Sequence, residues 1–297
     1  MTYPLPDLRL TILAHGETCL THQMRLLFFG LLIFLTGCSP QFDAIVHPAK
    51  GQDRVRSVTI TVFAAASLTD PFTEIGLLFE AAQPEVRVVF NFAGSQQLAQ
   101  QLSQGAPADL FASANQKQMA AAVASGRVLA GKPKILAQNR LVVIFPQDNP
   151  AGLKRLQDLA KPGLTLVLAA EVAPAGQYAL DFLAKASQEP AFGPHFKEQT
   201  LKNVVSFEQN VRAVLIKVAL GEADAGIVYS SDLSGRHAGE IGHLDIPDHL
   251  NTLATYLAAP TRDSPNPGQA QAFVNFLLSP AGQEILAKHG FIPLAPQ

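Results

Sequence analysis

Two serines stand where a strand-like segment gives way to a helix-like one. Ser67 follows the alternating apolar residues of 58–62 and a run of alanines, and Ser95 follows the strand-like segment 87–92 in the same way. Serine hydroxyls and the unpaired N–H groups of a helix start are neutral hydrogen-bond donors, and the helix dipole adds a partial positive charge. Such a junction suits an anion. The same serines would serve equally well as ordinary helix caps.

The elements that must position these serines alternate along the chain. Period-2 or continuous apolar runs predict strands at 58–62, 87–92, 110–112, 141–145, 164–170 and 225–229. Apolar residues at helical spacing predict helices at 68–79, 95–102, 153–159, 174–183, 211–218, 273–277 and 285–286. Strands that alternate with helices predict an α/β fold with mostly parallel sheets flanked by helices. Ligands of such folds bind at the carboxyl ends of the strands, where the serines lie.

Composition limits the class of partner. The chain has 297 residues, 48% of them hydrophobic and 15% charged, which is typical of a folded protein and not of a disordered one. Its formal net charge is −2, with no basic or acidic blocks. We therefore expect neither nucleic acid nor an anionic membrane surface as a partner, and a small solute fits better.

The N-terminal region has the pattern of an export signal. Met24 and Arg25 precede the apolar run 26–35, which has about half of the roughly 20 residues that a spanning helix needs, and Gly37 and Cys38 follow. The string Leu-Thr-Gly-Cys resembles a bacterial lipobox, which implies cleavage and lipidation at Cys38. An ordinary secretory peptide cut near Gly37 is the alternative. We expect residues 1–37 to comprise an upstream extension and a signal peptide, with translation starting at Met24 and cleavage before Cys38, and 38–57 to form a tether.

Enzyme chemistry finds little support in the sequence. Its two cysteines are Cys19, upstream of the expected start, and Cys38, so neither a disulfide nor a thiolate nucleophile is predicted. Neither serine junction has the Gly-X-Ser-X-Gly elbow of a hydrolase, and the histidines have no common ligand spacing. We expect a protein that is not an enzyme and needs no cofactor.

Five motifs in sequence order carry a resemblance to a known family. They are Phe-Ala-Ala-Ala-Ser-Leu at 63–68, Phe-Ala-Gly-Ser at 92–95, Gly-Ala-Pro-Ala-Asp-Leu-Phe at 105–111, Pro-Ala-Gly at 174–176 and Gly-Ile-Val-Tyr at 226–229. From about residue 58 to 293 the chain resembles the periplasmic molybdate-binding proteins of ABC importers. The body tyrosines are not adjacent, unlike those of iron-binding relatives of the same fold.

The resemblance implies a two-lobed type II periplasmic-binding-protein fold with the ligand in the cleft between the lobes. The chain of such a fold crosses between lobes twice, and we place the crossings near Asn139 and Glu240. Residues 58–138 and 240–297 would then form the first lobe, and 139–239 the second.

The resemblance also implies the residues that contact the ligand. The family's oxyanion contacts fall on Ser67 and Ser95 in the first lobe and on Ala175, Val211 and Tyr229 in the second. All but Tyr229 lie at predicted helix starts, and the tyrosine adds a phenol donor. These residues would contact the oxygens of the oxyanion and would not bind its metal atom directly.

One departure from the family pattern lies just before the Pro-Ala-Gly motif. Glu171 stands there, and an acidic group that pointed into the cleft would oppose anion binding, so we expect it to face solvent.

The function implied is that of a monomeric, extracytoplasmic, lipid-anchored binding protein. It would capture molybdate, and tungstate of nearly the same size, and deliver it to an ABC permease and its ATPase. A pocket made only of donors would reject protonated phosphate, whose O–H would find no acceptor, and smaller sulfate would be rejected by size. A binding protein for another tetrahedral oxyanion such as sulfate, or a solute sensor without an importer, are the alternatives.

Overall fold

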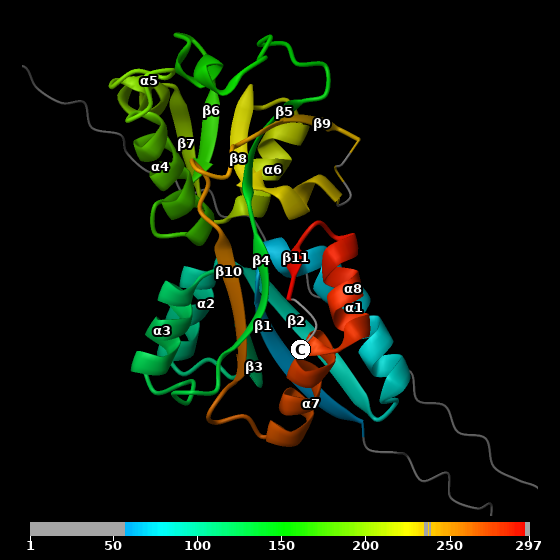
Figure 1. Ribbon diagram of the computed structural model, residues 1–297. Helices are drawn as coiled ribbons and strands as arrows, with labels where there is room; N and C mark the ends of the chain where they lie inside the picture. The colour runs from blue at the N-terminus through cyan, green and yellow to red at the C-terminus, as the bar shows by residue number, and fades with distance from the viewer. Residues whose placement is uncertain (1–56, 235–236, 238, 295–297) are drawn as a thin grey trace, which may run out of the picture. The chain divides into compact units, whose positions relative to one another are not determined.

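The computed structural model of the protein describes residues 57–234, 237 and 239–294, which are drawn in colour in Figure 1. The expected signal peptide, Cys38 and residues 38–56 of the tether lie outside the described residues. Within the described ranges, no helix has both the length and the apolar character needed to cross a membrane.

The first lobe is built on a six-stranded sheet in the order β11-β4-β10-β3-β1-β2. Its strands are β1 (Val58–Ala65), β2 (Val86–Ala93), β3 (Leu110–Ser113), β4 (Lys134–Asn139), β10 (Ala254–Pro260) and β11 (Ile292–Pro293). β1 pairs in parallel with β2 and β3, whereas β10 is antiparallel to both of its neighbours. The carboxyl ends of β1 and β2 consequently meet at one edge, with Ala65 opposite Ala93.

Helices cover both faces of this sheet. They are the short 3₁₀ segment η1 (Ala66–Leu68), α1 (Thr69–Ala82), α2 (Ser95–Ser103), α3 (Gln116–Ala124), α7 (Pro267–Leu278) and α8 (Pro280–Lys288). On one face α1 packs on α7 through Phe72, Phe79 and Phe273, whose ring centroids lie 5.0 to 6.1 Å apart in edge-on pairs. On the other face α2 and α3 bury Leu98 and Met119 in a separate apolar cluster.

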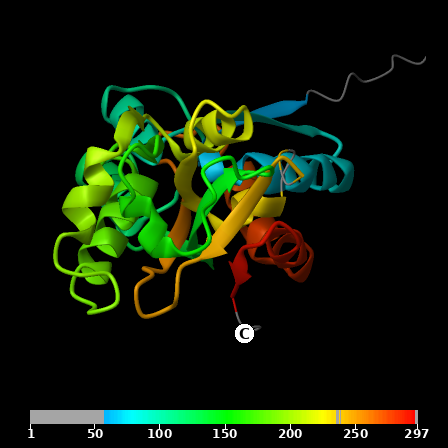
Figure 2. The same cartoon turned by 90° about the horizontal axis from the view of Figure 1, so that it is seen from above.

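The second lobe has a five-stranded sheet in the order β7-β6-β8-β5-β9. Its elements are β5 (Leu141–Pro146), η2 (Leu156–Ala160), β6 (Leu166–Ala169), α4 (Pro174–Ala186), α5 (Phe196–Lys202), β7 (Val204–Glu208), α6 (Val211–Ala219), β8 (Ala225–Tyr229), η3 (Ser230–Ser234) and β9 (Ile241–Asp245). β6 pairs in parallel with β7 and β8, and β5 is antiparallel to β8 and β9. Seen from above, the α4–α5 side and the α7–α8 side lie on opposite sides of the body (Figure 2). The α/β, two-lobed fold class predicted from the sequence is confirmed.

The chain passes between the sheets at two places. The first crossing lies between Asn139, the end of β4, and Leu141, the start of β5. The return crossing was expected near Glu240, and this is wrong, because β9 pairs with β5 in the second sheet (Ile144 opposite His243). The return therefore lies in residues 246–253, between β9 and β10, and β9 belongs to the second lobe.

A short α-helix was expected at 153–159, but the structure has the 3₁₀ segment η2 instead. The Asp158 carboxylate accepts hydrogen bonds from the backbone N–H groups of Lys154 (2.8 Å) and Arg155 (3.2 Å). These bonds fix extended backbone at Arg155, with φ −150° and ψ 160°, so no helix can pass through it.

Candidate functional site

A small pocket lies between the two lobes, at the strand ends that lead into helices. Its lining residues are Ala65, Ala66, Ser67, Gly94, Ser95, Ala114, Ala173, Pro174, Ala175, Asn210, Val211 and Tyr229. None of them carries a charged side chain. A ligand here would meet small side chains, hydroxyls and backbone groups contributed by both lobes.

The first lobe contributes two buried serines. Ser67 lies in η1, directly after β1, and its Oγ lies 2.8 Å from the Tyr256 hydroxyl on β10. Ser95 is the first residue of α2, and its Oγ accepts a hydrogen bond from the backbone N–H of Ala114 at 3.0 Å. Each hydroxyl thus has a hydrogen-bond partner within the first lobe.

The second lobe contributes two helix starts. Pro174 begins α4, and Ala175 and Gly176 follow it with N–H groups that have no partner inside the helix. Gly176 lets the helix approach β6, because a Cβ there would lie 2.1 Å from the Ala170 carbonyl oxygen. The Pro-Ala-Gly motif therefore sets the first turn of α4 tightly against the strand that precedes it.

The start of α6 is arranged in the same way. The Asn210 side chain accepts from the backbone N–H of Ala213 at 3.1 Å, as an N-cap does. The N–H groups of Val211 and Arg212, in the turn before Ala213, have no partner inside the helix. Two helix dipoles of the second lobe thus begin at the pocket.

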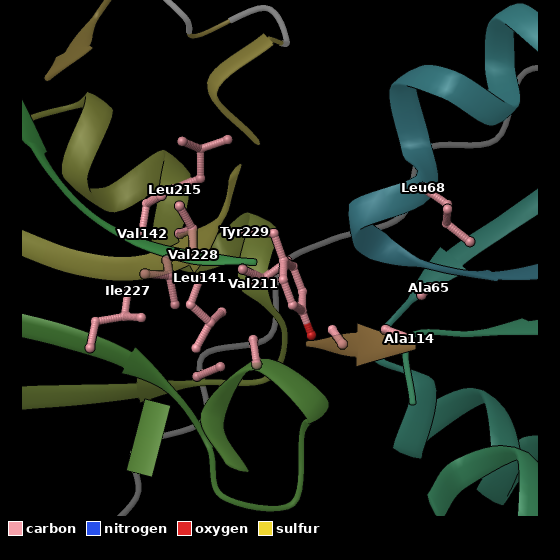
Figure 3. Close-up of a cluster of buried hydrophobic side chains, with 14 of the residues drawn as sticks. Ala65, Leu68, Ala114, Leu141, Val142, Val211, Leu215, Ile227, Val228 and Tyr229 are labelled. Atoms are coloured by element: carbon pink, nitrogen blue, oxygen red, sulfur yellow. The ribbon is translucent and has the colours of Figure 1, made fainter. Parts of the chain in front are cut away.

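Tyr229 closes the pocket at the end of β8. The side chain extends from the apolar cluster of the second lobe toward the side where Ala65 and Ala114 lie (Figure 3). Its hydroxyl is buried and has no hydrogen-bond partner among the described residues. Burial raises the pKa of Tyr229 well above 10, and the nearby Tyr256 raises it further. The phenol therefore stays protonated and remains a donor.

The two lobes touch each other beside the pocket. Gln96 donates to the backbone carbonyl of Gln209, and Gln97 donates to the side-chain oxygen of the same residue, both at 2.7 Å. Arg212 of α6 hydrogen-bonds and pairs with Asp70 of α1. The structure is therefore that of the closed arrangement, with the lobes in direct contact.

A group of three charged residues, of which only Asp232 is fully buried, lies beside the start of α6. The Arg212 guanidinium lies between Asp70 and the buried Asp232, whose Oδ1 is 3.6 Å from it. Asp232 also accepts from the backbone N–H of Tyr229 at 3.0 Å. Burial raises the pKa of Asp232 to about 6, although Arg212 and the Tyr229 N–H oppose the rise.

The structure brings all five residues expected from the sequence to one pocket: Ser67, Ser95, Ala175, Val211 and Tyr229. That each contacts an oxyanion stays a prediction. Glu171 is exposed and does not line the pocket, in line with the expectation that it faces solvent. Within the ranges that the structure describes, no cluster of His, Cys, Asp or Glu could hold a metal ion directly.

Sequence reasoning missed Tyr256, Asn210 and the role of Gly94. Tyr256 lies far from Ser67 in sequence, and nothing local marks it as a partner. Asn210, directly before the predicted helix at 211–218, could have been found as its N-cap. A Cβ on Gly94 would lie 2.7 Å from the backbone carbonyl oxygen of Gln209 in the other lobe, and no pattern within one segment reveals this close approach.

Comparison with known proteins agrees with this geometry. The family model described as "Bacterial extracellular solute-binding protein" matches residues 60–292. The chain belongs to that family. It is 40% identical over 261 residues to the molybdate-binding protein ModA of Mycobacterium tuberculosis, covering 88% of this chain and 94% of the relative. This confirms the resemblance to molybdate-binding proteins that the five motifs indicated.

Solved structures share the fold. The periplasmic molybdate-binding protein of Azotobacter vinelandii superposes with a TM-score of 0.68 at 21% identity, covering 80% of this chain and all of that one. The sulfate-binding protein SubI of Mycobacterium tuberculosis superposes with a TM-score of 0.70, also at 21% identity, covering 80% of this chain and 88% of that one. At such identities the likeness shows the fold alone. The family is one of substrate-binding proteins and not of catalysts.

Proposed function

We propose that the protein captures molybdate, and tungstate as well, in the pocket between its lobes. The observation that carries the proposal is the Tyr229 hydroxyl, a buried donor with no hydrogen-bond partner in the part of the chain that the structure describes, at a pocket where helices of both lobes begin. A dianion would supply acceptors to the phenol, to the two serine hydroxyls and to the free N–H groups of the helix starts.

Neutral donors suffice for tight binding. Hydrogen bonds to a charged group contribute about 1.5 to 3 kcal/mol each, so about six to eight of them hold an ion at micromolar to nanomolar affinity after the costs of ordering and closure. Because the ion would touch both lobes, binding would favour the closed arrangement.

The cellular role follows from the family and from the N-terminal sequence. We propose that lipid on Cys38 anchors the protein outside the cytoplasm, and that the closed, monomeric protein delivers its ion to an ABC permease and its ATPase. Replacing Cys38 by Ser should release the protein from the membrane fraction. A Cys38→Ser protein that stays membrane-bound would contradict the anchor and leave the ligand proposal intact.

Titration calorimetry of the purified protein with molybdate, tungstate, sulfate and phosphate tests the ligand directly. We expect strong binding of the first two and weak or undetectable binding of the others. Equal affinity for sulfate would instead favour a general sulfate-type binding protein, for which the shared fold of SubI is a precedent. No heat with any of the four anions would refute oxyanion binding.

Tyr229→Phe separates binding from folding, because its two expected effects have opposite signs. Loss of one donor to a charged ligand should weaken molybdate binding by about 1.5 to 3 kcal/mol, or roughly 10- to 150-fold. Removal of a buried hydroxyl without a partner should leave the ligand-free protein equally stable or up to about 3 kcal/mol more stable. A variant with unchanged affinity would show that the phenol does not face the ligand.

A further inference from the structure

Three charged side chains lie beside the pocket without lining it. Asp70 belongs to α1, Arg212 to α6 and Asp232 to η3. Each follows closely in sequence on one of the residues that are predicted to contact the ion, which are, in the same order, Ser67, Val211 and Tyr229. A displacement of any of these charged residues is therefore transmitted to the pocket through a very short stretch of backbone.

The guanidinium of Arg212 faces two carboxylates with two different nitrogen atoms. Its Nη2 donates a hydrogen bond to Oδ2 of Asp70, and its Nη1 lies 3.6 Å from Oδ1 of Asp232. A planar guanidinium can do this because its N–H groups point in fixed, divergent directions. Asp70 belongs to the first lobe, whereas Arg212 and Asp232 belong to the second. Arg212 thus has one acidic partner in its own lobe and one across the cleft.

The partner in its own lobe holds Arg212 in place. The Asp232 side chain is 1% exposed, and its Oδ2 accepts from the backbone N–H of Tyr229 at 3.0 Å, so the carboxylate is fixed by the end of β8. The Arg212 side chain is itself largely buried. A guanidinium restrained in this way loses little further side-chain freedom when Asp70 approaches, so the contact across the cleft forms at a low entropic cost.

The charge of Asp70 has the wrong sign for a residue beside an anion site. Through space alone, removal of its carboxylate would strengthen the binding of an anion. Its contact with Arg212 has the opposite effect, because this contact joins the lobes and stabilises the closed arrangement that would hold the ion. The two side chains are 17% and 32% exposed, so their interaction is screened less than that of a fully exposed pair. We therefore expect the effect on closure to be the larger one.

We propose that Asp70 and Arg212 form a latch between the lobes that retains the bound ion, with Asp70 as a positioning residue that does not touch the ion. The inference rests on the proposed oxyanion function and deepens it, because it names a contact that couples capture to closure. The latch adds to the neutral contacts that Gln96 and Gln97 make with Gln209. Its loss should mainly speed release of the ion, since a contact that forms on closure has little effect on the first encounter.

Asp70→Ala tests the latch, because the two effects of the carboxylate predict opposite results. We expect the dissociation constant for molybdate to rise roughly 3- to 10-fold in calorimetry. Most of the rise should lie in the dissociation rate, measured by chasing labelled molybdate with unlabelled ion, while the ligand-free melting temperature stays close to that of the wild type. Asp263→Ala is the matched control, because it breaks an aspartate–arginine pair within the first lobe (Arg127, 2.7 Å) and should leave the affinity unchanged.

A double-mutant cycle shows whether the effect passes through Arg212. In an Arg212→Met background, Asp70→Ala should no longer weaken binding. Salt provides a second measure, which does not need that background to fold with Asp232 buried and without its cation. The ratio of the Asp70→Ala and wild-type dissociation constants should fall toward one as sodium chloride is raised, because a partly exposed ion pair is screened.

Four results would overturn the latch and leave molybdate capture standing. They are a folded Asp70→Ala protein that binds molybdate as tightly as the wild type or more tightly, a loss of affinity that persists in the Arg212→Met background, a ratio that does not change with salt, and an equal fall in ligand-free stability. A wild-type protein that does not bind molybdate would overturn the proposed function, and the latch with it.

Discussion

Gly94 lies at the contact between the lobes, so a methyl group there should hinder closure without harming either lobe. A Cβ at this position would lie 2.7 Å from the backbone carbonyl oxygen of Gln209 and 2.6 Å from the end of the Gln96 side chain. The Gln96 side chain can move, but the Gln209 carbonyl belongs to the backbone of the other lobe. The φ of Gly94 is −59° and its ψ is 136°, which alanine adopts freely. The clash therefore exists only while the lobes touch.

The size of the expected loss of affinity follows from overpacking at one close contact. Inserting a methyl group into a packed site costs about 1 to 3 kcal/mol. Because this steric cost arises only in the closed arrangement, it should weaken ligand binding roughly 5- to 150-fold. In the open arrangement, Gly to Ala restricts the unfolded chain and stabilises the fold by up to about 1 kcal/mol. We expect Gly94→Ala to lower molybdate affinity while the ligand-free melting temperature is unchanged or higher.

Calorimetry measures the affinity, thermal unfolding measures the stability, and small-angle scattering with and without molybdate measures closure. Gly268→Ala is the matched control, because a Cβ there has no heavy atom within 4 Å. An affinity equal to that of the control would refute the reasoning. So would a fall in ligand-free stability that matches the loss of affinity, because the clash would then lie within a lobe.

Two further changes test the supports of the site. Gly176→Ala should destabilise the fold by about 3 kcal/mol or more in denaturant unfolding, because its Cβ would overlap the Ala170 carbonyl within the same lobe; a variant as stable as the wild type would contradict that close approach. Asp232→Asn should remove a pH dependence. With a folded pKa of about 6 and an ordinary unfolded pKa near 4, the native protein binds more protons than the unfolded chain between these values, so wild-type stability relative to the variant should fall by about 2 kcal/mol as the pH rises from 4 to 6. Unfolding curves at several pH values measure this difference, and a constant difference would show that Asp232 titrates normally.

The sequence predicted those parts of the fold whose signal lies within one segment. The alternating residues of β1 and the continuous apolar run at β6 were visible because burial leaves a local pattern. The strands that complete the sheets were not visible. β9 contains glycine, histidine and aspartate, and β7 exposes Val205 and Phe207. Both depend on pairing with strands that are distant in sequence, which also explains why the return crossing was misplaced.

The residues of the pocket also fall into those with a local sequence signal and those without one. Ser67 and Ser95 could be singled out because a serine between a strand and a helix is a local feature. Ala175 and Val211 would act through their position at helix starts, and only family resemblance distinguished them from other small or apolar residues. Tyr256 and Gln209 depend on contacts between segments more than 100 residues apart, 189 positions for Tyr256 and Ser67 and 113 for Gln209 and Gln96, so no local pattern could reveal them.

Arg212 explains why only neutral groups would hold the proposed anion. It follows Val211 directly, yet its side chain does not line the pocket, because the guanidinium is engaged by Asp70 and Asp232. Two carboxylates and one guanidinium sum to one negative charge when all are ionised, so this group offers no attraction to an anion. Its contribution is to join α6 to α1 across the cleft, which favours closure. A full positive charge in the pocket would attract anions of any shape, whereas oriented N–H and O–H donors attract only those whose acceptors meet them. Arg212 therefore serves the closed arrangement, and in the proposed function discrimination between anions would rest on the directions of the hydrogen bonds.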